Sequence, residues 1–537
     1  MKMFKKFLII SLVLLLMAGC GGSGDTAGTN DDNVVIANET DIASMDLHIA
    51  TDGTSFEAIT LGFAGLTELS SSNEPLADMA SNWDVSDDGK VYTFYLADTN
   101  WSNGTPVTAH DFVYAWKRLV SEETASEYSF IMGVVDVVNA NEILAGNASV
   151  DELGVKALDD KTFEVTLNKP VDFFLGLMAF PSFFPLNEEF VESQGDQYAL
   201  TAENMIYNGP YVMESWTPGS DYSFVLNDQY YKADTINTKK VSFRFVQDTQ
   251  TAMLEYQSGN IDLVKLTGEM VDAYGSDEGF NNVLQGFLWY LSLNFEVVEL
   301  QNHNLRMAIS YAVDRETIAN SVLKDGSVPA EGIVPRALAI GPTGNDFRDD
   351  SGVLIAYDPS KAASYYQAAV AELGGDVNIE LLFEDTESSK AVAEYIQSNL
   401  EENLPGISVT LNSKPKKTRL DLQQNGEYQM ALHRWGPDYA DPQTYLDLFL
   451  KDSVSNYGNY DSEKYTSLVN EGTNGASASD SDARWQLLLD AEKTLISEDM
   501  AVVPVYQNGG AYMINPKLSG FEFHSAGVNN FRHIKFD

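Results

Sequence analysis

The side chains that most often carry catalysis or hold metal are few in this chain and lack catalytic spacing. Its six histidines form no His-Glu-x-x-His pair and have no neighbouring cysteines, so the sequence gives a zinc site no support. These histidines are His48, His110, His303, His433, His524 and His533. Neither a Gly-x-Ser-x-Gly turn nor a Walker-type phosphate loop is present. The chain has 79 Asp and Glu residues, so spacing alone does not exclude a catalytic pair of carboxylates. We predict no enzymatic activity, no cofactor and no metal.

The only cysteine, Cys20, follows a basic start and an apolar run over 7–17. That pattern is typical of a secretory signal, and the run is too short to span a bilayer. Ala18-Gly19-Cys20 resembles the lipobox of bacterial lipoproteins, in which the cysteine becomes the lipid-modified N-terminus; an ordinary secretory signal is the alternative. Two acyl chains are what stable anchoring requires. We predict a signal peptide (1–19), a lipidated flexible linker (20–33) and attachment to the extracytoplasmic face of the cell membrane, which is extracellular in a Gram-positive bacterium and periplasmic otherwise.

Charge and composition restrict the partners further. The formal net charge is −46, and such a surface repels nucleic acid and anionic lipid head groups. The acidic residues are scattered, so both solubility and attraction of cationic ligands can explain them. With no second cysteine, disulfides cannot hold the fold, and stability must come from burying the 44% apolar content.

Strand and helix patterns alternate along the whole length, which favours α/β or α+β lobes. Alternating or β-rich segments predict strands at 91–96, 162–167 and 241–246. Thr108 with Asp111 resembles a capping box that opens a helix. Apolar residues at helical spacing predict two further helices, Leu305 to Ile318, ended by Gly326, and Lys361 to Leu373, closed by Gly374-Gly375.

The stretch Trp101-Ser-Asn-Gly-Thr-Pro-Val-Thr-Ala-His-Asp-Phe-Val-Tyr-Ala-Trp-Lys-Arg-Leu-Val120 resembles the oligopeptide-binding proteins of ATP-driven importers, a large extracytoplasmic solute-binding family. Its aromatic residues are expected in a core. Further similar stretches follow in family order: 153–160, 208–211, 258–262, 305–318 and 502–506. The resemblance implies an α/β, two-lobed, periplasmic-binding-protein-like fold with hinge strands and an additional inserted domain. It divides the chain into lobe I (34–65, 185–285 and 505–537), the inserted domain (66–184) and lobe II (286–504).

The segment Arg434-Trp435-Gly436-Pro437-Asp438-Tyr439 is similar to the part of the family that receives a peptide's α-ammonium group. Asp438 matches the receiving aspartate. An α-ammonium is the one charge that every unblocked peptide shares, and a buried ammonium needs a carboxylate partner. The resemblance places peptide-pairing strand edges near Thr51-Asp52-Gly53 and Arg434-Trp435-Gly436. It also places three residues, less securely aligned, on the walls of the site: Tyr128, Asn294 and Tyr506.

This chain departs from well-known members at the peptide's C-terminal end. Gln423 and Leu432 stand where those members carry basic residues that meet the ligand's carboxylate, although His433 and Arg434 lie adjacent and could substitute. Lys416 stands near a position where a tryptophan lines the site in those members. These differences suggest longer peptides or a solvated peptide C-terminus.

The resemblance implies a monomeric, lipid-tethered receptor that captures oligopeptides between its lobes and delivers them to an ABC permease with separate ATPase subunits. A receptor for a single peptide pheromone is an alternative in the same class. A surface hydrolase or a chaperone is an alternative from other classes.

Overall fold

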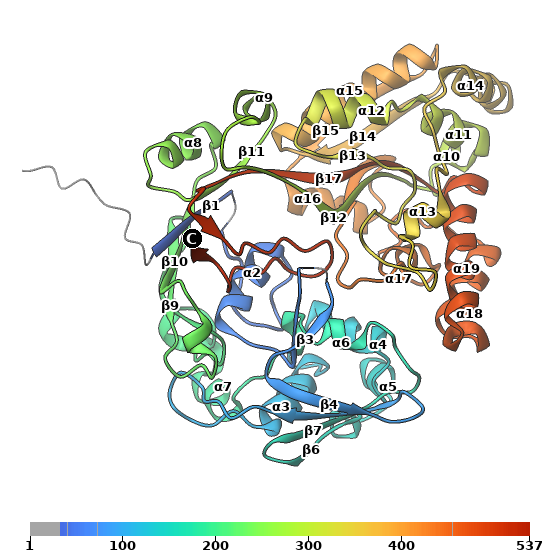
Figure 1. Ribbon diagram of the computed structural model, residues 1–537. Helices are drawn as coiled ribbons and strands as arrows, with labels where there is room; N and C mark the ends of the chain where they lie inside the picture. Colours follow the sequence, from blue (N-terminus) through green and yellow to red (C-terminus); the bar gives the residue numbers. More distant parts are fainter. Residues whose placement is uncertain (1–32, 40, 72, 454) are drawn as a thin grey trace, which may run out of the picture.

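One mixed sheet runs through both halves of the molecule in the computed structural model, which describes residues 33–39, 41–71, 73–453 and 455–537 (Figure 1). The predicted signal peptide, Cys20 and all of the predicted linker but Asn33 lie outside these residues. In spatial order the strands are β15 (Ser408–Lys414), β14 (Asn378–Glu384), β16 (Met430–Trp435), β12 (Phe280–Leu293), β17 (Val502–Ile514), β11 (Leu263–Leu266), β1 (Asn33–Asn38), β10 (Lys240–Phe245), β9 (Asp221–Leu226) and β8 (Tyr211–Thr217), with β13 (Val328–Pro329) paired to β17.

The two long antiparallel strands β12 and β17 join the lobes. Residues 280–284 of β12 pair with 509–513 of β17 beside lobe I, and residues 288–292 pair with 502–507 beside lobe II. The register shifts between Leu284 and Leu288, so the regular ladder is interrupted where the chain crosses from one lobe to the other. Gly286 lies in this stretch, and a Cβ there would come 1.6 Å from the carbonyl oxygen of Ser525. The crossing therefore requires glycine.

Two large cores lie on either side of this crossing. Lobe II has its own core, which is formed mainly by residues 288–506. The predicted inserted domain carries a separate four-stranded sheet, β4 (Ala80–Val85), β5 (Val91–Leu96), β7 (Thr162–Thr166) and β6 (Val155–Asp159), yet its core is continuous with that of lobe I. Trp101 and Trp116 are fully buried in this joint core, as expected for the family-like stretch. We infer that the inserted domain moves with lobe I as one body.

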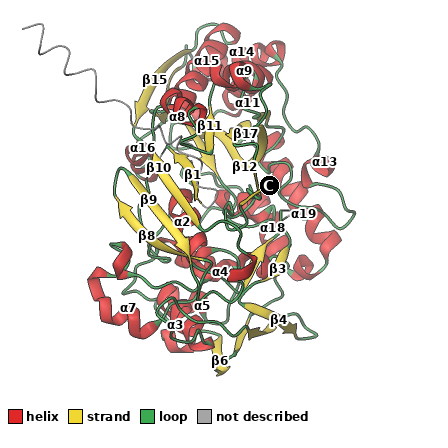
Figure 2. Cartoon of the chain, turned by 60° about the vertical axis from the view of Figure 1, so that its left-hand side comes forward, coloured by secondary structure: helices red, strands yellow, loops and turns green. Residues whose placement is uncertain are grey.

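Helices surround these sheets (Figure 2). The principal ones are α2 (Gly53–Gly62), α3 (Ala109–Leu119), α7 (Glu188–Gln194), α8 (Thr249–Gln257), α9 (Glu269–Tyr274), α11 (His303–Ala312), α14 (Pro359–Leu373), α15 (Glu387–Asn403), α16 (Lys416–Gln424), α17 (Gln443–Leu446), α18 (Glu463–Thr473) and α19 (Ser481–Lys493). Among the residues described, none of the helices has the length and apolar character needed to cross a membrane.

Most of the elements expected from pattern are confirmed. The three predicted strands correspond to β5, β7 and β10 to within one residue at each end. In α3 the backbone N–H of Thr108 donates to the Asp111 carboxylate at 2.7 Å, which confirms the capping box. Gly374 ends α14 with a positive φ of 80°.

The helix expected from Leu305 to Ile318 is wrong in extent. The helix α11 ends at Ala312, and Asp314 starts a new short helix by accepting the N–H of Thr317 at 3.1 Å. The buried guanidinium of Arg315 donates to the backbone carbonyls of Ser310, Val313 and Pro504, which holds the break. The apolar spacing continues through this break, because the apolar side chains of both segments pack into the same core of lobe II.

Candidate functional site

The loop after β16 carries Asp438 and is fixed from three sides. The Tyr445 hydroxyl donates to the carbonyl oxygens of Trp435 at 2.9 Å and of Gly286 at 2.5 Å. The N–H of Gly527, from the C-terminal part of lobe I, donates to the Pro437 carbonyl at 3.0 Å. A Cβ on Gly436 would come 2.2 Å from the Phe287 ring. The loop therefore lies against the crossing strands and holds Asp438 at the boundary between the lobes.

The carboxylate of Asp438 has one hydrogen-bond donor and no cation in the described chain. The hydroxyl of Tyr128, from the inserted domain, donates to Oδ1 at 3.4 Å. Burial raises the pKa of Asp438 to about 7, and the bond from Tyr128 opposes this only in part. Tyr128 stays protonated, because burial and Asp438 raise its pKa well above the usual range. This carboxylate can accept a positively charged hydrogen-bond donor that the protein itself does not supply.

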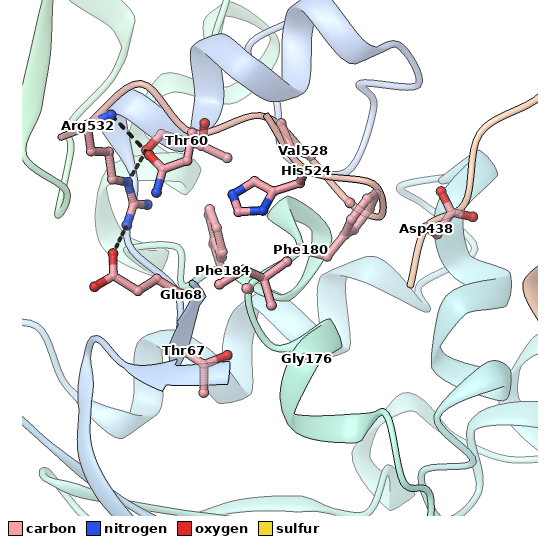
Figure 3. A pocket seen from close by; sticks show the side chains of 14 residues that line it. Thr60, Thr67, Glu68, Gly176, Phe180, Phe184, Asp438, His524, Val528 and Arg532 are labelled. Atoms are coloured by element: carbon pink, nitrogen blue, oxygen red, sulfur yellow. Dashed lines mark hydrogen bonds and ion pairs between the residues drawn. The ribbon is translucent and has the colours of Figure 1, made fainter. Parts of the chain in front are cut away.

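A small cavity opens beside Asp438 between lobe I and the inserted domain (Figure 3). Its volume is about 30 Å³, which is room for a water molecule or two. Phe180, Phe184 and Val528 make it apolar near Asp438. At the far end the guanidinium of Arg532 lies 3.7 Å from the Glu68 carboxylate. His524 is neutral there, because burial lowers its pKa to about 4.

A row of side chains crosses the sheet next to this loop. Arg434 on β16 lies opposite Trp289 on β12, which in turn lies opposite Tyr506 on β17. The Arg434 guanidinium stacks 5.4 Å from the Trp289 ring and 5.3 Å from the Phe287 ring, and Trp289 stacks on Tyr506 at 5.6 Å. Tyr506 is buried at the base of this row, so it supports Arg434 through Trp289.

The last four residues of β16, 432–435, have a strand partner on one side only within the described chain. Pairing of β14 with β16 ends at Ala431, whereas pairing with β12 continues to Trp435. Near this edge, Arg419 of α16 donates to Nδ1 of the neutral His433 ring at 2.9 Å, and the Gln423 amide oxygen lies 3.1 Å from the same nitrogen. An unpaired strand edge can add an extended peptide as a further strand.

Other residues expected in the site have partners within the protein. The segment Thr51-Asp52-Gly53 is no strand edge, because it begins α2 and both carboxylate oxygens of Asp52 bond to Ser55. The amide of Asn294 donates to the carbonyls of Gly426 and Tyr428 and accepts the N–H of Glu296, so it ties a loop together. His433 is buried and neutral, because burial and then Arg419 lower its pKa, so it is not a replacement anchor for a carboxylate.

The lobes also contact each other beside the site. Tyr439 stacks on Phe173 of the inserted domain at 4.2 Å. The Lys169 ammonium donates to the Thr473 carbonyl at 2.6 Å, at the C-terminal end of α18, and to Asn474. Together with the bond between Tyr128 and Asp438, these contacts join lobe II to the inserted domain in this structure.

Several residues that build the site carry no signal in the sequence. Phe287 and the C-terminal residues His524 and Val528 lie far from Asp438 in the chain and carry no local motif. The aromatic run at 180–184 was the one signal available, since Phe180 and Phe184 both line the cavity.

Comparison with known proteins agrees with this geometry. The dipeptide-binding protein of Lactococcus lactis is 32% identical over 538 aligned residues, which cover 97% of this chain and 96% of that protein. A structure of Listeria monocytogenes OppA bound to peptide is 32% identical, covers 95% of this chain and 99% of its own, and superposes with a TM-score of 0.84. The pheromone receptor PrgZ, solved to show its mode of peptide binding, is 29% identical, covers 94% of this chain and 100% of its own, and gives 0.85.

These structures have the two-lobed periplasmic-binding-protein fold, so the predicted fold class is confirmed. The model of the bacterial extracellular solute-binding proteins, family 5, matches residues 74–457, which is well over half of the chain. The descriptions of these relatives and of the family name the binding of peptides or solutes. The chain belongs to family 5 of the bacterial extracellular solute-binding proteins.

Proposed function

We propose that this protein is the peptide-binding component of an ABC importer, which captures oligopeptides between its lobes and delivers them to a permease with separate ATPase subunits. The observation that carries the proposal is the carboxylate of Asp438, which lies at the lobe boundary and has no positively charged partner among the residues that the structure describes. A peptide's α-ammonium group supplies that charge. The names of the relatives from Lactococcus and Listeria support the same ligand class.

The backbone of the ligand extends from Asp438 along the unpaired edge of β16. Main-chain hydrogen bonds to residues 432–435 hold any sequence, because they do not depend on side chains. The first residue of the ligand lies beside the cavity next to Asp438, whose volume of about 30 Å³ admits no more than a small side chain. The first lobe contributes through Tyr128, which belongs to the inserted domain and bonds to the same carboxylate.

Closure of the lobes follows from these contacts. A ligand shifts the equilibrium between open and closed forms only if it binds them with different affinity. Here the ammonium contacts Asp438 from lobe II while the first residue lies beside a cavity lined by lobe I and the inserted domain. The permease recognises the closed, monomeric protein.

A lipid on Cys20 tethers the protein near its permease, and the polar residues after it act as a hydrated linker. Replacing Cys20 by serine tests this part of the proposal. We expect the Cys20→Ser protein in the soluble fraction of cells and the unchanged protein in the membrane fraction, measured by immunoblot after fractionation. Equal membrane association of both proteins contradicts lipid anchoring.

A peptide pheromone receptor is the second candidate, favoured by the similarity to PrgZ. The two functions differ in selectivity, because an importer that supplies nutrients needs a site that tolerates many side chains. Mass spectrometry of peptides retained by the purified protein from a mixed pool separates them. Many retained sequences support the importer, whereas one dominant sequence supports the receptor.

Replacing Asp438 by asparagine tests the ammonium site with little change in shape. We expect peptides with a free N-terminus to lose at least about 30-fold in affinity, because removing one partner of a desolvated charge pair costs about 2 to 5 kcal/mol. N-acetylated peptides already lack the charge and should lose less than about threefold. Isothermal titration calorimetry measures both. Asp482→Asn, an exposed change on α19, serves as the control, and equal losses for the two kinds of peptide contradict the assignment.

The pH dependence of binding gives an independent test. Ammonium binding favours ionised Asp438 and lowers its pKa from the free value of about 7, so binding below pH 7 releases a proton and affinity falls with the pH. Above about pH 8 the peptide's own amine loses its charge. We expect calorimetric affinity to be greatest between pH 7 and 8.

The acidic limb of this profile should disappear in Asp438→Asn. Burial also raises the pKa of Glu57 and of Asp447 to about 7, so a wild-type profile alone does not identify the group. An unchanged acidic limb in the asparagine variant assigns the titration to one of those residues instead.

A further inference from the structure

The contact between Lys169 and the end of α18 joins two bodies that have separate cores. Lys169 follows β7 in the inserted domain, whose core is continuous with that of lobe I, whereas α18 belongs to the core of lobe II. The Lys169 ammonium donates to the carbonyl oxygen of Thr473 at 2.6 Å and to the side-chain oxygen of Asn474. Thr473 ends α18, where a carbonyl has no partner within its own helix and the helix dipole favours a cation. Figure 1 shows α18 at the outer edge of lobe II, on the same side as α4 (Ile131–Val134) and α5 (Ala140–Leu144) of the inserted domain.

Carboxylates of both bodies act on the Lys169 ammonium. Asp136 of the inserted domain lies 3.8 Å from it, and Asp447 acts on it from lobe II, whereas Arg484 opposes them. Burial lowers the pKa of Lys169, and the two carboxylates compensate for this only in part. The Lys169 side chain is 27% exposed, so the contact removes much of the hydration of its charge. The bonds to α18 are therefore charge-assisted and partly shielded from water, which makes them stronger than bonds at an open surface.

A second contact between the two bodies lies four residues further along the same segment. The ring of Phe173 stacks on the ring of Tyr439 at 4.2 Å, with an angle of 20° between the ring planes. Tyr439 follows Asp438, so this stack joins the inserted domain to the loop that carries the proposed ammonium site. A cavity of about 20 Å³, room for about one water molecule, is lined by Lys169 and Phe173 from one body and by Thr473 from the other. The facing surfaces fit closely around it.

Neither Lys169 nor Phe173 lies where the ligand is proposed to bind. Neither lines the cavity beside Asp438, and neither belongs to the strands that pair with β16. The free energy of their contacts is therefore the same whichever peptide lies between the lobes. A peptide held between the lobes leaves only after they separate, so these contacts must break before it is released.

We propose that Lys169 and Phe173 are positioning residues of a latch between the inserted domain and lobe II, and that this latch slows the release of every peptide by the same factor. The proposal rests on the proposed function and adds to it the residues that set how long a ligand stays bound. The latch acts on dissociation, because it breaks before the ligand leaves, and it has little effect on association, because the ligand enters while the bodies are apart. Retention gained in this way makes no demand on the side chains of the ligand.

Replacing Lys169 by methionine tests the latch, because the change removes the ammonium and keeps the length of the side chain. The probes are three pentapeptides, Ala-Ala-X-Ala-Ala with alanine, phenylalanine or lysine as X. Stopped-flow tryptophan fluorescence of the purified protein measures their association and dissociation rate constants. We expect dissociation to become about tenfold faster, as loss of a hydrogen bond from a charged group implies, and association to change by less than about threefold. The factor should agree within about twofold among the three peptides.

Two further variants of the inserted domain separate the latch from a general effect of losing a lysine. Lys169→Arg keeps a charged donor for the same carbonyl and should retain most of the slow release. Lys156→Met is the matched control, because Lys156 pairs with Glu164 inside the inserted domain at 2.6 Å, and it should leave both rate constants unchanged.

A change on the lobe II side tests whether the effect depends on the contact itself. Asn474→Ala removes one acceptor of the Lys169 ammonium and should make dissociation about threefold faster. Combined with Lys169→Met it should add less than about twofold, because residues in direct contact do not act additively. Asn474→Ala also keeps the test decisive if Lys169→Met does not fold, which circular dichroism checks.

Two results overturn the latch. One is an unchanged dissociation rate constant in folded Lys169→Met or, where that variant does not fold, in Asn474→Ala. The other is a faster release confined to one peptide, which makes Lys169 a ligand contact instead. Either result leaves the proposed function standing, provided that the pentapeptides bind and Asp438→Asn weakens them. Failure of every pentapeptide to bind the wild-type protein overturns the proposed function, and the latch with it.

Discussion

The backbone ladder between β12 and β17 is the constraint on which the arrangement of the two lobes depends. Both strands continue from lobe I into lobe II, so hydrogen bonds of one sheet hold together two bodies with separate cores. The ladder is irregular only between Leu284 and Leu288 and between Trp289 and Tyr290 in their pairing with β17. The first irregularity contains Gly286, which touches the C-terminal segment of lobe I and the Tyr445 hydroxyl of lobe II. A change of twist here changes the lobe angle, and the loop with Asp438 is fastened to the same place.

Charge is distributed unevenly along the boundary that this crossing creates. Among the described residues, Asp438 lies at one end without a cation within ion-pair distance, and Arg434 lies four residues earlier without a carboxylate at that distance. Glu384 and Asp52 both act on the nearby Lys416. The two groups do not neutralise each other, since neither basic residue is within ion-pair distance of Asp438 among the described residues.

The sequence predicted several elements from local signals, and it predicted the two-lobed fold class through resemblance to the family. The capping box at Thr108, the strand patterns and the glycine at 374 each act within a few residues. It also indicated Asp438, Arg434 and Tyr128, although by resemblance and not from spacing. It could not indicate that Asp52 caps a helix by bonding to Ser55, or that Asn294 closes a loop, because these roles depend on partners that only the folded chain brings together.

The contributions of Phe287 and of residues 524–528 to the site also had no sequence signal. Phe287 is more than a hundred residues from Asp438 in the chain, and residues 524–528 are nearly ninety away, so no periodic pattern connects them. The break after α11 was missed because apolar spacing records burial and not backbone continuity.

The contacts between the lobes act against the cost of burying the Asp438 carboxylate, which has no cation beside it among the described residues. Lys169 at the end of α18 and Phe173 on Tyr439 favour the closed form whether or not a peptide is present. Closure also surrounds the Asp438 carboxylate with protein and removes its hydration. Without a cation beside it, the carboxylate is more easily protonated, and its pKa is therefore raised. Under the proposed function, a peptide ammonium would remove this penalty and leave the contacts between the lobes unopposed. The carboxylate proposed to recognise the ligand would then also distinguish empty from loaded protein, because a ligand alters the lobe equilibrium only through its different affinity for the two forms.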